Sequence, residues 1–269
     1  MCLYLAKTER RKEFVKELLG RPDIGVKLQK ARHVLLKPNI VSQEFYPTTT
    51  HPETLLACLK FLTSLHKEVA VADGPAIDAG DSTHILRHHP LQKVCDRFGV
   101  PLVDLLSREM TMIEARNGMR LEMSTLCFNH DFIISLPVLK SHSICFFTGA
   151  LKNQFGFPSA RQRARLHMGD DIFRAIAEVN RAIKPDLFIV DAVTTMIKTN
   201  EVRHGGVPIK LGYMLGGTDP VALDSTGLRL LSELEPQLKG KTWQDVPYLV
   251  HAAMSGLGNP QAEPVTIRI

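Results

Sequence analysis

Several apolar runs of this chain end in a polar residue beside a proline or glycine, and this repeated pattern strongly constrains the fold. The runs are HVLLKPNI (33–40), EVAVADG (68–74), DFIISLPVLK (131–140), DLFIVDAV (186–193) and LGYMLGGTD (211–219). Their apolar residues are mostly continuous, which is typical of strands covered on both faces. Helical patterns alternate with them, as over 53–65 and 171–183. The sequence therefore predicts an α/β fold, with one or more mostly parallel sheets and helices on both faces.

The length of 269 residues and the apolar share of 44% suit a domain with a large buried core. We expect residues 1–269 to form a single domain, with two lobes that divide near residue 130 as the alternative. Further helices are predicted over 9–19, 84–98 and 220–234, and a further strand over 100–105.

Composition narrows the class of partner. The formal net charge of +5 favours an anionic ligand. Aromatic residues make up only 6% of the chain and are not interleaved with basic clusters, so nucleic-acid binding is not expected. No run of 18 apolar residues occurs, so we expect no membrane span. The N-terminal apolar run is too short for a signal peptide, and no CxxC pair occurs among the five cysteines. These features predict reduced thiols and a cytoplasmic location.

The strand ends carry the candidate site. Ligands of open parallel sheets bind beyond the carboxyl ends of the strands, and parallel strands bring those ends to one edge. Lys37 and Asn39 follow the first run, Asp73 ends the second and Asp191 ends the fourth. Burial would lower the pKa of Lys37 unless an anion compensates its charge, although the side chain has the alternative of extending to solvent.

Lys140 and His142 follow the third run and are separated by one residue. In an extended segment residues i and i+2 face the same side, so an ammonium and an imidazole would meet one ligand. This pair suits anion binding, or proton transfer by His142 near neutral pH. The alternative is an ordinary surface loop.

The segment GALKNQFG (149–156) places Lys152 and Asn153 between two glycines. Glycines let backbone N–H groups approach an anion closely, and Lys152 adds positive charge. Arg161, Arg163, Arg165 and His167 follow, either as part of this basic neighbourhood or as a solvated loop.

The carboxylates leave several roles open. Asp219 precedes Pro220 and is expected to cap a helix. Asp73 and Asp191 are candidates for binding a ligand or metal, orienting His142 or pairing with the lysines. No HExxH or similar spacing occurs, so no metal site is predicted.

In this order, the motifs LLKPNIVS, THPETLLACLKFL, VADGP, ISLPVLKSH, TGALKNQFG, KPDLFIVDAV and GGTDPVALDS resemble the family called domain of unknown function 362. The resemblance runs from about residue 33 to 258. It implies that certain polar residues occupy family-motif positions, namely Lys37, Asn39, His51, Asp73, Lys140, His142, Lys152, Asn153 and Asp219.

Many members of that family carry a ferredoxin-type cysteine module, which this sequence lacks. We therefore expect no iron–sulfur cluster held by this chain alone, leave the cofactor unknown, and consider a separate ferredoxin-type protein as a partner. A more distant similarity to the nickel-pincer lactate racemase implies that Lys152 is the place to look for a covalent adduct.

Three functions fit these observations. The first is an enzyme acting on a small carboxylate or phosphate, in which lysines hold the anion, His142 moves a proton and redox chemistry is linked through a separate ferredoxin. The second is a carrier that binds an anionic ligand or cofactor without catalysis. The third is a structural subunit of a redox assembly.

Overall fold

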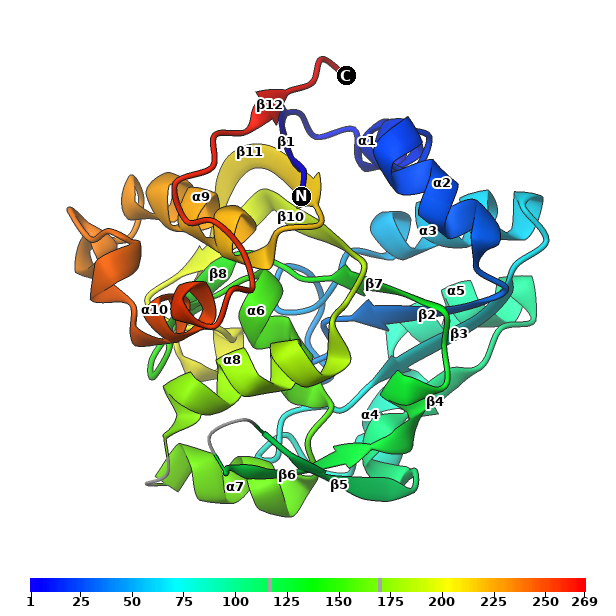
Figure 1. Ribbon diagram of the computed structural model, residues 1–269, viewed down its shortest axis with the longest axis horizontal. Coiled ribbons are helices and arrows are strands. Elements are labelled where there is room, and N and C mark those ends of the chain that lie inside the picture. Colours follow the sequence, from blue (N-terminus) through cyan, green and yellow to red (C-terminus); the bar gives the residue numbers. More distant parts are fainter. Residues whose placement is uncertain (116–117, 169–170) are drawn as a thin grey trace.

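The computed structural model describes residues 1–115, 118–168 and 171–269, and a twisted central sheet organises it (Figure 1). The strands of this sheet are β1 (Leu3–Lys7), β2 (His33–Pro38), β3 (Glu68–Asp73), β4 (Leu102–Asp104), β7 (Phe132–Leu136), β10 (Leu187–Ile197), β11 (Val207–Gly217) and β12 (Val265–Thr266). Their spatial order is β12-β1-β11-β10-β7-β2-β3-β4. The expected strands are thus all present.

The sheet is mostly parallel, as the sequence predicts. The strands from β10 through β7, β2 and β3 to β4 pair in parallel, and so do β1 and β12. β11 runs antiparallel to its two neighbours, β1 and β10. A short loop joins β10 directly to β11, and such a connection can produce only an antiparallel pair.

Helices cover both faces of the sheet. Packed against one face are α1 (Arg11–Leu19), α2 (Pro22–Lys30), α3 (Pro52–Ser64), α4 (Ser82–His88) and α5 (Pro90–Phe98). The other face carries α6 (Ala150–Asn153), α8 (Ile172–Ile183), α9 (Pro220–Ser232) and α10 (Pro247–Met254). Below them lie α7 (Ala160–Met168) and a hairpin of β5 (Met110–Glu114) and β6 (Arg120–Ser124) (Figure 1).

The alternation of side chains along the strands explains the continuous apolar runs. In β2, Leu36 packs with the core of the first face, whereas Leu35 packs with a core on the other face. Ile134 and Ile133 of β7 divide in the same way. Because both faces are covered by apolar cores, the central positions of these strands carry apolar residues on both faces.

Two predicted elements have different bounds. The helix expected over 84–98 is two helices, because His89 is extended and Pro90 starts α5. A residue before proline is disfavoured in the helical conformation, which explains the break. The run over 131–140 is also divided. β7 ends at Leu136, and Lys140 begins the short strand β8 (Lys140–His142), which pairs with β9 (Phe146–Thr148).

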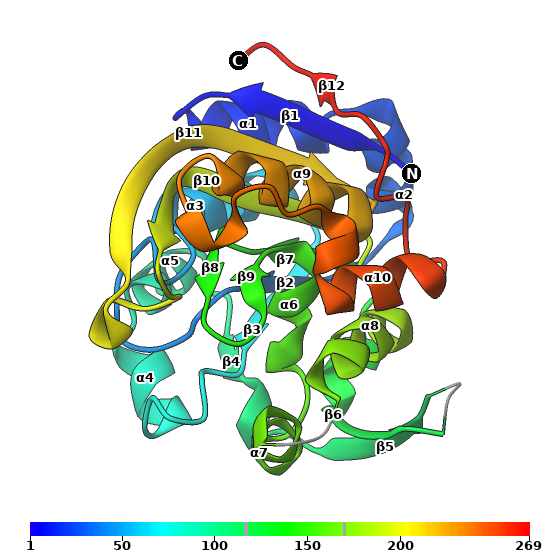
Figure 2. The same ribbon diagram turned by 90° about the vertical axis from the view of Figure 1, so that its left-hand side faces the viewer.

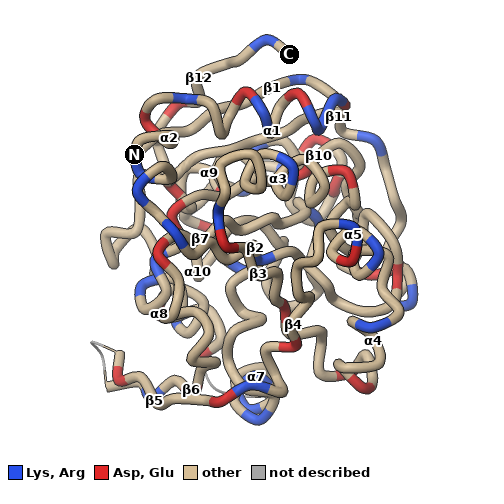
Figure 3. The backbone as a smooth tube through the Cα atoms, turned by 90° about the vertical axis from the view of Figure 1, so that its right-hand side faces the viewer, with Lys and Arg blue, Asp and Glu red and all other residues tan. Residues whose placement is uncertain are grey.

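Across the three described ranges, the structure has no helix with the length and apolarity needed to cross a membrane. Lys and Arg alternate with Asp and Glu over the side of the molecule drawn in Figure 3, so positive charge is not gathered there into one patch.

Candidate functional site

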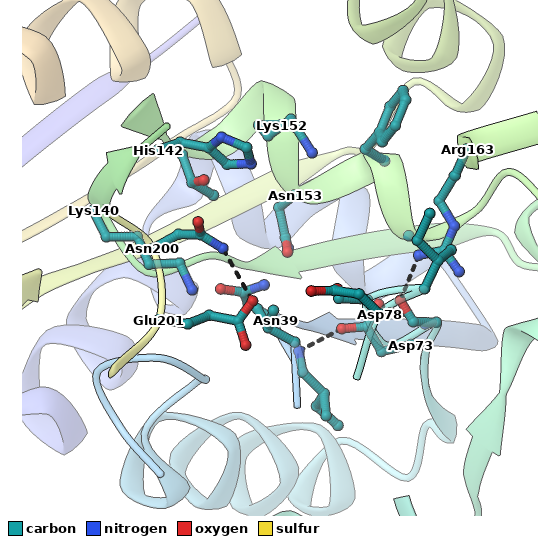
Figure 4. Close-up of a pocket in the computed structure, with 18 of the residues that line it drawn as sticks. Asn39, Asp73, Asp78, Lys140, His142, Lys152, Asn153, Arg163, Asn200 and Glu201 are labelled. Atoms are coloured by element: carbon teal, nitrogen blue, oxygen red, sulfur yellow. Dashed lines mark hydrogen bonds between the residues drawn. The ribbon is translucent and has the colours of Figure 1, made fainter. Parts of the chain in front are cut away.

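A pocket of about 290 Å³ opens where the strand order of the sheet reverses. From β2 the chain continues to β3 on one side, while β7 lies on the other side of β2. Open α/β sheets bind ligands at such a switch point, beyond the carboxyl ends of the strands. Seven residues predicted from the sequence line this pocket: Lys37, Asn39, Asp73, Lys140, His142, Lys152 and Asn153 (Figure 4).

One wall of the pocket, which we call the sheet wall, consists of Lys37, Asn39 and Asp73 at the ends of β2 and β3. Lys37 forms an ion pair with Asp73 and also donates to the carbonyl of Pro38 at 2.9 Å. Asp73 accepts from the backbone N–H of Ile40 and, at 2.7 Å, from that of Gly74. Burial lowers the pKa of Lys37 and raises that of Asp73, while their mutual attraction opposes both shifts.

Gly156 makes room for this ion pair. A Cβ atom at this position would lie 2.5 Å from Oδ1 of Asp73 and 3.0 Å from Nζ of Lys37. Any other residue would therefore push against two buried charged groups. This observation gives a structural reason for the second glycine of the 149–156 segment.

The opposite wall, which we call the β8–α6 wall, carries Lys140, His142 and Lys152. In Figure 2, β8 and β9 lie beside α6 under the curved strands β10 and β11. Lys140 and His142 both line the pocket, as the i, i+2 spacing predicts. Lys140 is buried and donates to the carbonyl of Thr48. Burial lowers the pKa of Lys140 to about 7, and the carboxylate of Glu201 only partly opposes this shift.

The hydrogen bonds of His142 define its tautomer. Nδ1 accepts from the backbone N–H groups of Ile144, at 3.1 Å, and Cys145, at 3.2 Å, so it carries no proton. Burial and the charge of Lys152 hold the pKa of His142 well below its usual value. The ring is therefore neutral at pH 7, with its proton on Nε2. His142 is thus a hydrogen-bond donor in this pocket, and it does not supply a free basic nitrogen.

Lys152 lies on α6, whose first turn is anchored by a buried carboxylate from α9. Asp224 accepts from the backbone N–H groups of Ala150, at 2.5 Å, and Leu151, at 3.1 Å. A Cβ atom at Gly149 would lie 2.1 Å from Oδ1 of Asp224. The sequence predicts that this glycine lets backbone amides reach an anion. Here the anion is a side chain of the same protein.

The amine of Lys152 differs from the other charged groups of the pocket in its contacts. Its Nζ lies 4.4 Å from the centre of the Phe155 ring. Within the described part of the chain, it has no hydrogen bond or ion pair. Burial, together with the charges of Arg163 and Lys37, lowers its pKa. The adjacent Asn153 donates to the carbonyl of Lys37 at 3.3 Å and to Oγ of Ser135 at 2.9 Å. Its Oδ1 is buried and finds no hydrogen-bond donor in the described part of the chain.

Two further pocket residues, Arg163 and His167, come from the segment for which the sequence left open a basic neighbourhood or a solvated loop. They belong to α7, and their i, i+4 spacing places both on the face toward the pocket, whereas Arg161 and Arg165 are exposed. Arg163 donates to the carbonyls of Gly74, at 3.1 Å, and Pro75, at 2.9 Å. Its Nε and Nη2 are buried and have no hydrogen-bond partner among the residues described, and burial lowers its pKa to about 10.

At the pocket rim, Asp78, Glu201 and His204 bring potential metal-binding atoms to within 4.8 Å of one another. Arg203 already bonds both carboxylates, at 2.8 Å to Asp78 and 2.7 Å to Glu201. This guanidinium supplies the positive charge that the two carboxylates require, so the cluster is a rim ion-pair network.

Asp191, predicted to bind the ligand or balance the lysines, does not line the pocket. It is a buried residue of β10, where it accepts from Nε of Arg11 at 2.6 Å and from the hydroxyl of Tyr46 at 2.8 Å. Two other family-motif residues serve helix ends. His51 caps α3, and Asp219 caps α9 as predicted.

The five cysteines are all free. Cys58 and Cys95 lie in the core of one sheet face, whereas Cys127 and Cys145 lie in two separate cores on the other. Burial raises the pKa of Cys58, Cys95 and Cys127 to about 12. These thiols fill core volume, and the expectation that this chain alone holds no iron–sulfur cluster stays a prediction.

Comparison with known proteins places the pocket residues in a family. A family model described as domain of unknown function (DUF362) matches residues 34–229. The chain belongs to this family. The match includes the three strands at the switch point, together with β8, α6 and α7. All the residues that line the pocket therefore lie within the DUF362 region.

Relatives of this DUF362 chain include a thylakoid-associated protein of Synechocystis sp., which is 28% identical over 241 residues that cover 87% of this chain and 70% of that protein. Among solved structures, the lactate racemase apoprotein of Thermoanaerobacterium thermosaccharolyticum matches 86% of this chain with a TM-score of 0.54 and 14% identity. A structural-genomics protein of Thermotoga maritima matches 84% of the chain with a TM-score of 0.47. The match to the racemase spans 57% of the racemase chain, and it shows that the two proteins share an α/β fold.

Proposed function

We propose that the pocket binds a small carboxylate or phosphate and that the protein acts on this anion as an enzyme. One observation carries the proposal: Lys140, Lys152 and Arg163 line the same pocket, and none of them is bonded to a carboxylate within the described residues. The carboxylates that lie nearby are already engaged, Asp73 by Lys37 and the rim pair by Arg203.

Electrostatics explain why such a pocket favours an anion. Two like charges 4 Å apart repel by about 4 kcal/mol at an effective dielectric constant of 20. Burial is the main cause of the lowered pKa values of Lys140, Lys152 and Arg163, and like charges add to the shift for the two lysines: Lys152 acts on Lys140, and Arg163 acts on Lys152. A bound anion relieves both, so binding raises these pKa values and is accompanied by proton uptake near neutral pH.

The neutral His142 favours an enzyme over a simple carrier. Its Nε2–H is a fixed donor beside two ammonium groups, and such a donor stabilises negative charge that develops on a substrate oxygen. Lys140, with a pKa of about 7, exchanges a proton readily at neutral pH. In this proposal His142 donates a hydrogen bond, while a lysine moves the proton. The fold shared with lactate racemase, an enzyme named for a carboxylate, agrees with this class of substrate.

A ligand screen with matched variants tests the proposal. Thermal unfolding would be followed with phosphate, acetate, lactate and pyruvate, and small molecules retained by the purified protein would be identified by mass spectrometry. We expect at least one anion to stabilise the wild type, and Lys140→Met and Lys152→Met to lose this effect. Lys210→Met is the matched control, because Lys210 is exposed and pairs with Glu9 outside the pocket.

The variant His142→Asn separates the enzyme from the carrier. Asparagine keeps an acceptor for the amides of Ile144 and Cys145 but removes the Nε2–H donor. An enzyme loses turnover of the retained compound while it still binds the anion, whereas a carrier is unaffected. Equal stabilisation of the wild type and both pocket lysine variants would contradict the anion site itself.

A further inference from the structure

The three lysines that line the pocket differ in what their amines contact. Lys37 and Lys140 are each 1% exposed, and both donate to protein acceptors: Lys37 to Asp73 and Pro38, Lys140 to Thr48. Lys152 is partly exposed to the pocket, and its amine bonds to no acceptor among the described residues. A lysine nucleophile needs an accessible amine whose lone pair is free, and Lys152 alone of the three meets both conditions.

The backbone that carries Lys152 is held on several sides. Asp224 fixes the first turn of α6, and Asn180 donates to the carbonyl of Leu151 at 2.8 Å. Asn153 is tied to Ser135 at the end of β7. The side chain of Lys152 extends from this fixed turn toward the pocket, beside His142 (Figure 4). A reactive group supported in this way is positioned before a substrate arrives.

The surroundings of Lys152 lower the pKa of its amine. The titratable groups that act on it come from β2, β8, the loop after β8, and α7, and they are Lys37, Lys140, His142, Cys145, Arg163 and His167. None of them is a carboxylate. Burial is the main cause that lowers the pKa of Lys152, and its cationic neighbours add to the effect. The Phe155 ring stabilises the ammonium only weakly by comparison with an ion pair.

We propose that Nζ of Lys152 forms an imine with a small carbonyl compound that bears a carboxylate or phosphate group, such as a 2-oxo acid or a phosphorylated aldehyde. This inference rests on the proposed anion site and extends it to covalent chemistry. Lys140 and Arg163 supply positive charge for the anionic group, and the carbonyl carbon then lies within reach of Lys152.

The step balances without an oxidant or a reductant. The lone pair of Nζ forms a bond to the carbonyl carbon, and the π electrons of C=O move to the oxygen. The Nε2–H of His142 donates a hydrogen bond to this oxygen as its negative charge develops. Two protons pass from the nitrogen to the oxygen, the C–O bond breaks and water leaves. The products are the neutral imine and one water molecule.

Reductive trapping tests this step in the whole protein. Pyruvate, 2-oxoglutarate or glycolaldehyde phosphate would be added with sodium cyanoborohydride, and intact mass and peptide mapping would locate the adduct. We expect one adduct at Lys152 with at least one probe. The exposed lysines Lys12 and Lys210 serve as internal references. Each unit by which the pKa is lowered gives roughly tenfold more free amine at neutral pH, so Lys152 should react well ahead of them.

Two arginine variants separate nucleophilic reactivity from charge. Lys152→Arg keeps the positive charge but cannot form an imine, so it should lose the adduct and still bind phosphate in a thermal-shift assay. Lys140→Arg should keep the adduct at Lys152. Mapping of the wild-type protein gives the answer even if a variant fails to fold. Labelling at Lys140, or labelling of Lys152 no faster than that of Lys12 and Lys210, would overturn the proposal.

The outcomes distinguish this inference from the proposed function. Anions that stabilise the protein while every carbonyl probe fails to label Lys152 would refute the imine and leave the anion site intact. If neither anions nor carbonyl probes interact with the pocket, the anion site is refuted as well. If Lys152 is labelled, the relative yields of adduct with pyruvate and with glycolaldehyde phosphate show whether a carboxylate or a phosphate is preferred.

Discussion

The two walls of the pocket use the same kind of residue in opposite ways. On the sheet wall, Lys37 is buried against Asp73, and the pair is held by backbone amides and carbonyls. On the β8–α6 wall, Lys140 and Lys152 have no carboxylate partner within the ranges that the structure describes, and the anchoring carboxylate, Asp224, bonds the backbone instead. The buried lysine of the sheet wall is paired with a carboxylate without a ligand, whereas the lysines of the β8–α6 wall are not paired among the described residues.

This difference shows that a lysine at a strand end can serve either the fold or a ligand. Lys37 stabilises the junction of β2 and β3, so its removal should harm folding. Lys152 lines the pocket and has no ion-pair partner among the described residues, so its removal should harm binding. Functional sites commonly carry such locally unfavourable groups, whose cost is offset elsewhere in the structure.

The largest expected effect concerns the sheet wall. Lys37→Met leaves Asp73 buried without its partner, which should lower the free energy of unfolding by about 3–5 kcal/mol. Chemical denaturation measures this loss. The double variant Lys37→Met/Asp73→Leu removes both charges and should be more stable than the single variant. If the single variant is as stable as the wild type, Lys37 is not a structural lysine and the contrast between the walls fails.

The next effect concerns ligand affinity on the β8–α6 wall. Lys152→Met removes a charged donor to the anion, which should cost about 1.5–3 kcal/mol of binding, or roughly 10- to 100-fold in Kd. Titration calorimetry with the best anion of the screen measures this change. Lys210→Met should bind like the wild type. Comparable losses in both variants would indicate a general charge effect and not a site at Lys152.

The pH dependence of stability sharpens the comparison further. The pKa of Lys140 is lowered from 10.5 to about 7, so below pH 7 both the folded and unfolded chains carry the proton, and the penalty of the buried charge is complete. Above pH 7 the folded protein releases it first. The stability of the ligand-free wild type relative to Lys140→Met should therefore rise between pH 7 and 10.5, by up to about 1.4 kcal/mol per pH unit. A flat difference would contradict the assignment.

The smallest effect is expected at the pocket rim. The ion pair of Arg203 with Asp78 is substantially exposed, so Asp78→Asn should change stability by less than about 1 kcal/mol. Anion affinity should stay within about twofold of the wild type, a change of about 0.4 kcal/mol. A large loss of affinity in this variant would move the functional site from the β8–α6 wall to the rim.

Much of this arrangement could be predicted from the sequence because the strand ends carry their own signals. A lysine after an apolar run, as at Lys37 and Lys140, indicates a charge near the core, and the i, i+2 spacing correctly places Lys140 and His142 on one side. The partners of these residues could not be predicted. Whether Asp73 or Asp191 forms the ion pair with Lys37 depends on strand order, and that order is set by packing between distant segments.

The choice that the sequence left open for Arg163 and His167 has a similar explanation. Arg163 and His167 share a helix face, but this becomes informative only when 160–168 is recognised as a helix, and its sequence has little apolar periodicity. The hydrogen bonds of Asp224 to α6 could not be predicted either, because α9 contacts α6 only in the folded chain. Sequence patterns thus indicate which residues are near a strand end, whereas tertiary packing decides which charges remain free.

Denaturant unfolding of the wild type and Lys152→Met, each with and without the stabilising anion, tests the difference between the two walls most directly. We predict that the ligand-free variant is at least as stable as the wild type, because the amine that it removes has no carboxylate partner among the described residues, and that it loses the stabilisation given by the anion. A variant that is less stable without ligand, yet gains as much from the anion as the wild type does, would contradict this central claim.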